Sequence, residues 1–103
     1  MINEPSFTQK VIAIIKQIPK AKVATYGQIA MMAGNYRGAR QVVRVLHTLS
    51  EKHDLPWHRV INSKGTISLT GEGYRIQKQL LKAEGITIDE QGKIDFDRFL
   101  WKP

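Results

Sequence analysis

The stretch that decides the fold is TYGQIAMMAGNYRGARQVVRVLH, residues 25–47. Thr25 and Gln28 have the spacing of a capping box, which predicts a short helix through residue 32. Gly34 stands where a helix C-cap belongs, and residues 35–38 have the composition of a turn. A second apolar stripe follows, at positions 39, 42, 43 and 46. Two short helices joined by a tight, glycine-containing turn predict a helix-turn-helix.

The second of these helices has a polar face with a regular arrangement of basic side chains. Arg40, Arg44 and His47 are spaced i, i+4, i+7, so they lie along one side of the helix. Arg37 and Gln41 are close to the helix start. A helix that is apolar on one side and basic on the other suits a DNA groove. The alternative is an ordinary helix pair with a solvated basic face.

Upstream of this unit, the sequence predicts one more amphipathic helix. Ser6-x-x-Gln9 reads as another capping box, and Pro19 ends the helix. The apolar positions at helical spacing are Phe7, Val11, Ile14, Ile15 and Ile18.

Downstream, the pattern becomes that of short strands. Residues 50–54 are polar and predict a loop. Residues 60–61 and 66–69 are apolar or β-branched and flank a turn-forming segment at 62–65, which predicts a hairpin.

The last third of the chain predicts a helix and a second hairpin. The helix is expected over residues 74–84 with Gly85 as its cap, and the hairpin strands over 86–88 and 93–96. The apolar residues 99–101 are expected to dock on the core.

The length and composition of the chain exclude several classes of protein. The chain has 103 residues and 42% hydrophobic residues, which fits a single domain over residues 1–103. It has no apolar run long enough for a membrane span and no signal-peptide pattern, so a cytoplasmic location is expected. The absence of cysteine excludes disulfides, thiolate metal sites and a cysteine nucleophile.

The positive net charge is concentrated in the first half of the chain, because nearly all the acidic residues lie in the second half. The net charge is +7, and residues 1–50 hold seven of the 16 Lys and Arg against one acid, Glu4. Such asymmetry indicates a face adapted to a polyanion, or a solvated basic surface that aids solubility.

One further motif resembles a known family. Pro56-Trp57-His58-Arg59-Val60 resembles the active-site Pro-Cys-His-Arg-Val segment of the O6-alkylguanine-DNA alkyltransferases, with tryptophan in place of the reactive cysteine. That replacement is the mark of the alkyltransferase-like proteins. The similarity covers residues 18–85 and includes the segments 23–30, 38–42 and 80–85.

The resemblance implies a fold. It is a mainly α domain with small β elements, winged helix-turn-helix-like and similar to the C-terminal domain of those transferases. In this chain, Leu69-Thr70-Gly71-Glu72-Gly73 replaces their Gly-rich, Tyr-containing pocket loop, and residues 86–103 lie beyond the matched part.

The resemblance also implies a function. The expected protein is a non-enzymatic sensor that binds O6-alkylguanine in double-stranded DNA through the minor groove and flips the damaged nucleotide into a pocket. It would bend the DNA and flag the lesion for nucleotide excision repair proteins. Trp57 cannot accept an alkyl group, since indole offers only an N–H donor and an aromatic face. No catalytic residue, cofactor, metal or membrane is expected, and the protein is expected to be a monomer.

Two sets of site residues follow from the resemblance. The DNA-binding residues are expected to be Thr25, Tyr26, Gly27, Gln28, Arg37, Ala39, Arg40, Gln41, Arg44 and Ser63. The lesion pocket is expected to comprise Tyr26, Arg40, Leu46, Pro56, Trp57, His58 and Val60.

The resemblance gives individual roles to several of these residues. Arg40 matches an arginine finger that fills the gap left by the flipped base, and Tyr26 matches a tyrosine that crowds the 3′ phosphate. The backbone carbonyl of Val60 matches one that reads the guanine edge. His58 and Glu84 match residues that deprotonate the missing cysteine, so a structural hydrogen bond is the expected role here.

Arg59 is expected to pair with an internal carboxylate that the sequence does not specify. His47 and His53 lack metal-ligand spacing.

Two other functions stay open from the sequence. A sequence-specific helix-turn-helix transcription regulator would prefer a particular undamaged site. A hydrolase or lyase using His58 and Glu84 would alter the flipped base, although no activated nucleophile is apparent.

Overall fold

The first two helices begin where the sequence provides side-chain caps. The structure, a computed structural model, describes residues 5–103. In it, α1 (Phe7–Gln17) follows Ser6, and α2 (Tyr26–Met32) follows Thr25, each with a complete capping box. Both predicted helix starts are therefore confirmed, as is the end of α1 before Pro19.

The second helix of the pair is longer than the sequence predicted. α3 runs over Ala39–His53, so the loop prediction for residues 50–54 is wrong over all but its last residue. The hydroxyl of Ser50 donates to the carbonyl of Leu46, and Leu49 packs against the core. Polar side chains here satisfy helical carbonyls, and Asp54 in the left-handed region ends the helix.

The sheet pairs segments that are far apart in the sequence. β1 (Ala24–Thr25) lies parallel to β2 (Val60–Ile61), with Ala24 opposite Val60. The predicted hairpin between residues 60–61 and 66–69 is therefore wrong, and Thr66 instead forms an antiparallel bridge with Lys93. Both residues of β2 are buried, which is typical of a parallel strand covered on two sides.

The remaining elements follow the predicted order with shifted boundaries. A 3-10 turn, η1 (Trp57–Arg59), precedes β2, and α4 spans Gly71–Ala83, starting earlier than predicted. The second hairpin is confirmed in part by an antiparallel bridge between Ile88 and Ile94.

Phe96 was predicted to lie in a strand, and that prediction is wrong. It opens the short helix α5 (Phe96–Phe99), because the Asp95 side chain caps the turn. Phe99 and Trp101 are buried, which confirms that the C-terminal residues dock on the core.

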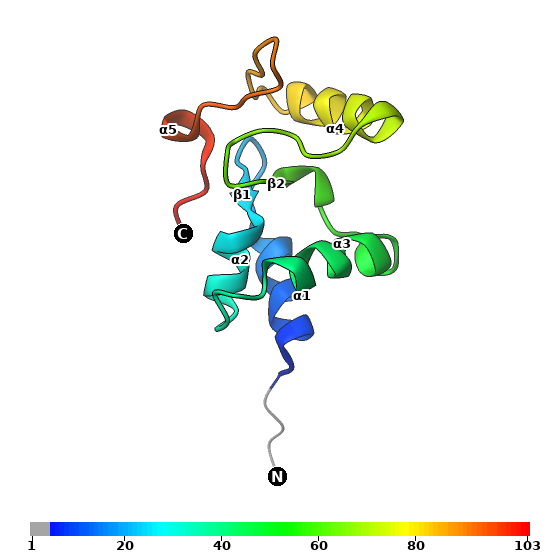
Figure 1. Ribbon diagram of the computed structural model, residues 1–103, viewed down its shortest axis with the longest axis vertical. Coiled ribbons are helices and arrows are strands. Elements are labelled where there is room, and N and C mark those ends of the chain that lie inside the picture. Colours follow the sequence, from blue (N-terminus) through cyan, green and yellow to red (C-terminus); the bar gives the residue numbers. More distant parts are fainter. Residues whose placement is uncertain (1–4) are drawn as a thin grey trace.

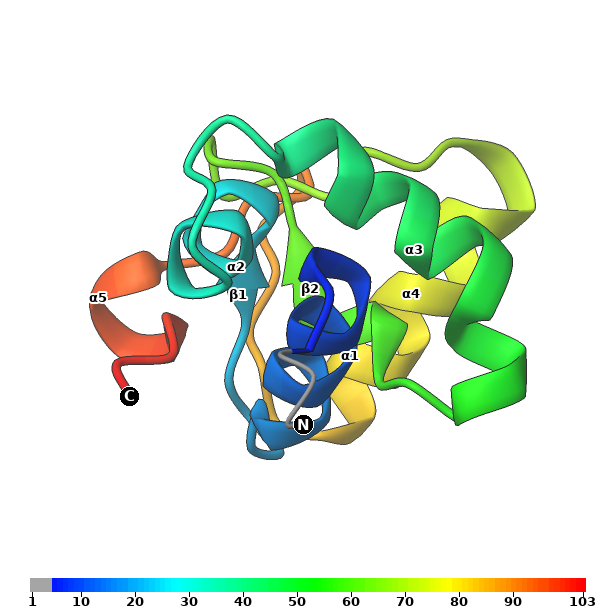
Figure 2. The same ribbon diagram turned by 90° about the horizontal axis from the view of Figure 1, so that it is seen from below.

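Two apolar clusters lie on either side of the small sheet. One joins α1, α2 and α3, and the other joins α4, α5 and the hairpin. Figure 1 shows the three N-terminal helices at one end, α4 and α5 at the other, and β1 and β2 between them. Figure 2 shows α3 and α4 on the same side of the sheet. The predicted fold class, mainly helical with a small sheet, is confirmed.

Among residues 5–103, no helix has the length and apolar content needed to cross a membrane.

Candidate nucleic-acid interface

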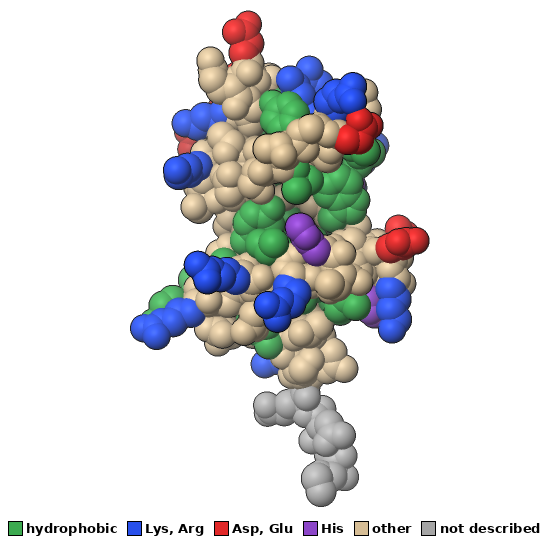
Figure 3. All heavy atoms as spheres, turned by 45° about the vertical axis from the view of Figure 1, so that its right-hand side comes forward, with side chains coloured by type: hydrophobic (Ala, Val, Ile, Leu, Met, Phe, Trp, Pro, Cys, Tyr) green, Lys and Arg blue, Asp and Glu red, His purple; other side chains and the backbone are tan. Residues whose placement is uncertain are grey.

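The outward face of α3 carries the predicted row of basic residues. Val42, Val45 and Leu46 are buried against the first cluster. Arg40 and Arg44 are exposed on the other side of the same helix. Figure 3 shows a band of apolar side chains with one histidine, Lys and Arg side chains gathered below it, and basic and acidic side chains mixed above it. This face therefore combines positive charge with an apolar band.

Two of the other predicted DNA-binding residues, Thr25 and Gln28, use their side chains for hydrogen bonds within the protein. Thr25 Oγ1 accepts from the Gln28 backbone N–H, and the Gln28 amide donates to the carbonyl of Trp101 at 2.8 Å. Gly27 has open space around it, where an added Cβ would meet nothing within 4 Å. The helix start at Gly27 is thus open to close approach, whereas the Thr25 and Gln28 side chains serve the local structure.

The predicted DNA-binding residues around the second helix lie mostly at the surface. Arg37 and Gln41 are exposed, and Ala39 is half-buried beside Arg40. Ser63, in the turn after β2, is also exposed.

An apolar pocket opens on this face between α3, η1 and α4. Its cavity volume is about 70 Å³, and it is partly open to solvent. Four residues of the predicted lesion pocket line it, namely Tyr26, Leu46, Trp57 and Val60.

The other predicted pocket residues lie outside this lining. Arg40 is exposed on α3, Pro56 precedes η1, and His58 is directed at Glu84. Four lining residues were not predicted, namely Val43, His47, Leu69 and Gln77. Val43 and His47 follow one another at i, i+4 on α3, a spacing that could have indicated a shared face.

Trp57 forms one wall of the pocket. Its backbone N–H donates to the carbonyl of Leu55 at 2.8 Å in a tight turn around Pro56, and the Arg59 N–H donates to the carbonyl of Pro56 at 3.0 Å in the 3-10 turn that follows. The indole is half-buried and packs against the first apolar cluster. Its ring meets that of His58 edge-on, with centroids 6.2 Å apart. The turn thus presents an indole where a flat ligand could contact it.

Tyr26 lies in the first turn of α2 and closes another side of the pocket. Its hydroxyl is 3.1 Å from Ser68 Oγ, in the segment that leads to α4. The phenol therefore joins the helix-turn-helix to the C-terminal part of the chain beside the pocket.

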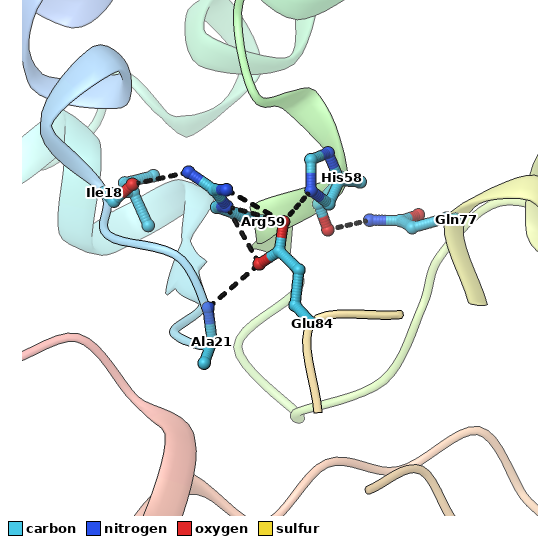
Figure 4. Close-up of polar contacts among 6 residues, drawn as sticks. All are labelled: Ile18, Ala21, His58, Arg59, Gln77 and Glu84. Atoms are coloured by element: carbon cyan, nitrogen blue, oxygen red, sulfur yellow. Dashed lines mark hydrogen bonds and ion pairs between the residues drawn. The ribbon is translucent and has the colours of Figure 1, made fainter. Parts of the chain in front are cut away.

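Behind Trp57, a charged group of three side chains, the Glu84 cluster, consists of His58, Arg59 and Glu84. His58 Nε2 is 2.6 Å from Glu84 Oε2, and Arg59 Nη2 donates to the same oxygen at 2.8 Å. The carboxylate that the sequence could not specify for Arg59 is thus Glu84. Figure 4 shows these contacts.

The Glu84 cluster also ties down the backbone between α1 and β1. Arg59 Nη1 donates to the carbonyl of Ile18 at 2.9 Å. The N–H of Ala21, which has a positive φ of 69°, donates to Glu84 Oε1 at 2.9 Å. One carboxylate therefore connects the end of α4, the turn that carries Trp57 and the approach to β1.

The ionisation of Glu84 reflects these contacts. Burial by itself raises the pKa of this carboxyl, but the hydrogen bonds from Arg59, His58 and the Ala21 N–H outweigh burial and hold its pKa at about 2. Glu84 is therefore an anion over the whole physiological range, and its oxygens are occupied by three donors.

The described residues of the site include neither a thiol nor a group of metal ligands. The chain contains no cysteine, so no thiol lies beside His58 to be activated. Within residues 5–103, no group of three or more His, Asp or Glu side chains is placed to hold a metal. The site has an apolar recess, an indole, and a basic helix at its rim.

Comparison with known proteins agrees with this geometry. Residues 6–86 match the family model described as the DNA-binding domain of 6-O-methylguanine DNA methyltransferase. A protein of Escherichia coli (strain K12) named DNA base-flipping protein is 50% identical over 98% of this chain and 78% of its own length.

A second relative combines sequence and structural similarity. Alkyltransferase-like protein 1 of Schizosaccharomyces pombe is 40% identical over 94% of this chain and 95% of its own length. Its crystal structure in complex with damaged DNA containing O6-carboxymethylguanine aligns with a TM-score of 0.85, covering 94% of this chain and 95% of that one. The chain therefore belongs to the family of the 6-O-methylguanine DNA methyltransferase DNA-binding domain, as one of its alkyltransferase-like members.

Proposed function

We propose that this protein is a non-enzymatic sensor of O6-alkylguanine in double-stranded DNA. It binds the duplex as a monomer, extrudes the damaged nucleotide into the pocket beside Trp57, and leaves the alkyl group in place. The names of its relatives, a base-flipping protein and an alkyltransferase-like protein, support this proposal.

The observation that carries the proposal is the apolar pocket with a tryptophan wall. Transfer of an alkyl group needs an acceptor such as a thiolate, and an indole in an apolar recess is not one. The same indole can contact the face of a purine, and base–aromatic stacking is worth about 1–3 kcal/mol. A pocket of this composition thus holds a flipped base without reacting with it.

The basic face supplies the contacts to the duplex. In the proposed complex, α3 docks in the minor groove, where the small Ala39 allows close approach. Arg40 enters the stack and occupies the space that the flipped base leaves, since a planar guanidinium can stack and donate hydrogen bonds. Tyr26, in the first turn of α2, crowds the phosphate next to the extruded nucleotide.

Preference for the lesion follows from the cost of extrusion. Flipping a base costs a few kcal/mol, and less when its pairing is already weak. Alkylation at O6 removes the N1 proton of guanine, so pairing with cytosine is weakened. Phosphate contacts from the basic face add affinity for all duplexes without regard to damage. Lesion selectivity therefore comes from easier extrusion and from the fit in the pocket.

The bound lesion still has to be removed by another activity. This protein leaves the alkyl group on the base and, in the proposed complex, bends the DNA at the lesion. We propose that nucleotide excision repair proteins recognise this complex and remove the damage.

The proposal is tested with two fluorescent duplexes that differ only in guanine or O6-methylguanine. The protein is titrated into each at low and at moderate salt, and the DNA is then recovered and its bases are analysed. The proposal expects tighter binding to the lesion duplex and an intact methyl group. Equal binding would favour a helix-turn-helix protein that does not recognise damage, and loss of the methyl group would show a reaction.

A further inference from the structure

One polar side chain is almost fully buried at the pocket wall. Gln77, on the inner side of α4, is 3% exposed and is the one buried polar residue among residues 5–103. It lines the pocket together with Trp57 and Val60. A buried amide in such surroundings costs free energy unless its hydrogen-bonding groups are satisfied.

The donors of this amide are already engaged. Gln77 Nε2 donates to the backbone carbonyl of His58 at 3.0 Å and to that of Val60 at 3.1 Å. Both partners are acceptors, so the amide nitrogen has to face them and the orientation of the group is fixed. Figure 4 shows the Gln77 nitrogen directed at the His58 carbonyl, with the oxygen on the other branch of the amide.

The amide oxygen, by contrast, has no partner among residues 5–103. The hydrogen bonds of Gln77 in the described part of the chain all come from its nitrogen. Yet no fully buried side-chain nitrogen or oxygen of the described residues lacks a partner. Gln77 Oε1 must therefore border open space, and the open space that Gln77 lines is the pocket.

The chemistry of the lesion limits what this acceptor can bind. An O6-alkylguanine has lost its N1 proton, so N1, N3 and N7 are all acceptors, and its 2-amino group is the one remaining N–H donor of the base. We infer that Gln77 Oε1 accepts a hydrogen bond from the 2-amino group of the extruded base, which makes Gln77 a specificity-determining residue. This inference rests on the proposed function.

The contact of Gln77 with Val60 strengthens the inference. The Val60 carbonyl, which the sequence comparison suggested as a reader of the guanine edge, already accepts from Gln77 Nε2. Gln77 Oε1 extends from the same amide and offers an acceptor with no competing partner. The Gln77 amide thus binds the backbone carbonyl of β2 through its nitrogen and offers its own oxygen as an acceptor at the wall of the pocket.

The test compares two lesions and three proteins. The duplexes contain O6-methylguanine or O6-methylhypoxanthine, which lacks the 2-amino group. The variants are Gln77→Lys, whose ammonium can donate to both carbonyls but accepts nothing, and Gln77→Met, which fills a similar volume without polar atoms. The free energy of extruding each base depends on the duplex and not on the protein. It therefore cancels when the ratio of the two affinities is compared between wild type and variant.

We compare the affinity for the O6-methylguanine duplex divided by the affinity for the O6-methylhypoxanthine duplex. This ratio should be about tenfold larger in the wild type than in either variant, because a variant without the acceptor loses the hydrogen bond to the 2-amino group. Thermal unfolding checks that each variant is folded, and the wild-type comparison stands even if one variant is not. The same ratio in the wild type and in a folded variant would overturn the inference. So would a wild type that binds the two lesions alike while still preferring O6-methylguanine to guanine.

A wild type without preference between guanine and O6-methylguanine would instead contradict the proposed function itself.

Discussion

At the scale of single residues, Glu84 fixes the geometry behind the pocket. Its side chain is 10% exposed and pairs with Arg59 and His58. We predict that Glu84→Gln lowers the free energy of unfolding by about 2 kcal/mol at neutral pH, because Arg59 loses a buried partner. Urea unfolding measures this. The matched control is Glu72→Gln, whose pair with Arg75 is 72% exposed on both sides and should contribute under about 0.5 kcal/mol. An equal loss of unfolding free energy in both variants would contradict a stabilising role for the Glu84 cluster.

The same carboxylate predicts an acid dependence of stability. Its pKa in the folded state is about 2, below the ordinary value of 4.5. A lowered pKa means that the stabilisation by Glu84 is present in full above about pH 4.5 and is lost as the pH falls towards about 2. The loss should be on the order of 2 kcal/mol, with allowance for solvent screening. Between pH 4.5 and 2, the free energy of unfolding should change less with pH in Glu84→Gln than in the wild type. The same pH dependence in both proteins would refute the prediction.

Arg40 is the residue on which extrusion depends. We predict that Arg40→Ala reduces the preference for O6-methylguanine over guanine about tenfold, because nothing then fills the space of the flipped base. Fluorescence titration of the paired duplexes measures the preference. Lys16→Ala, on α1 and outside the proposed interface, should leave it unchanged. An undiminished preference in Arg40→Ala would rule out the arginine finger.

The residues of the pocket were only partly predictable. Tyr26, Trp57 and Val60 belong to segments that resemble the alkyltransferases, so their approach to the pocket follows from the motif. Leu69 lies in the segment 69–73, where the sequence departs from that pattern, and Gln77 lies on α4 outside the motifs that carry the resemblance. Their position depends on how α4 packs against η1, which no local spacing in the sequence encodes.

At the scale of elements, α3 is expected to provide the salt-dependent part of DNA binding. We predict that Arg44→Ala weakens binding to damaged and undamaged duplexes by a similar factor and lowers the slope of log affinity against log salt by about 1. Titrations at several salt concentrations measure this slope, with Lys10→Ala on α1 as the control. A selective loss for the damaged duplex would assign Arg44 to the lesion instead of to a phosphate.

The elements also show which parts of the fold a sequence encodes locally. The starts of α1 and α2 were predictable because a capping box lies within four consecutive residues. The pairing of β1 with β2 was not, because it joins distant segments whose apolar pairs are equally compatible with a hairpin. The last turn of α3 was missed because its polar side chains have the composition of a loop.

At the scale of the whole molecule, two packed halves are joined at the site. The helix-turn-helix supplies the basic face and two sides of the pocket, and α4 supplies Gln77 on another. The Glu84 cluster holds the turn with Trp57 against both halves. The pocket is therefore lined from both halves of the molecule.

If the damaged base enters the pocket beside Trp57, the fluorescence of this tryptophan should respond to it. The chain has two tryptophans, and Trp101 is 8% exposed in the core, so it should give a constant background. The protein is titrated with the guanine and O6-methylguanine duplexes, with Trp57→Phe as the control. We predict a change in emission with the lesion duplex alone, and no such change in Trp57→Phe. The same change with both duplexes, or its persistence in Trp57→Phe, would contradict it.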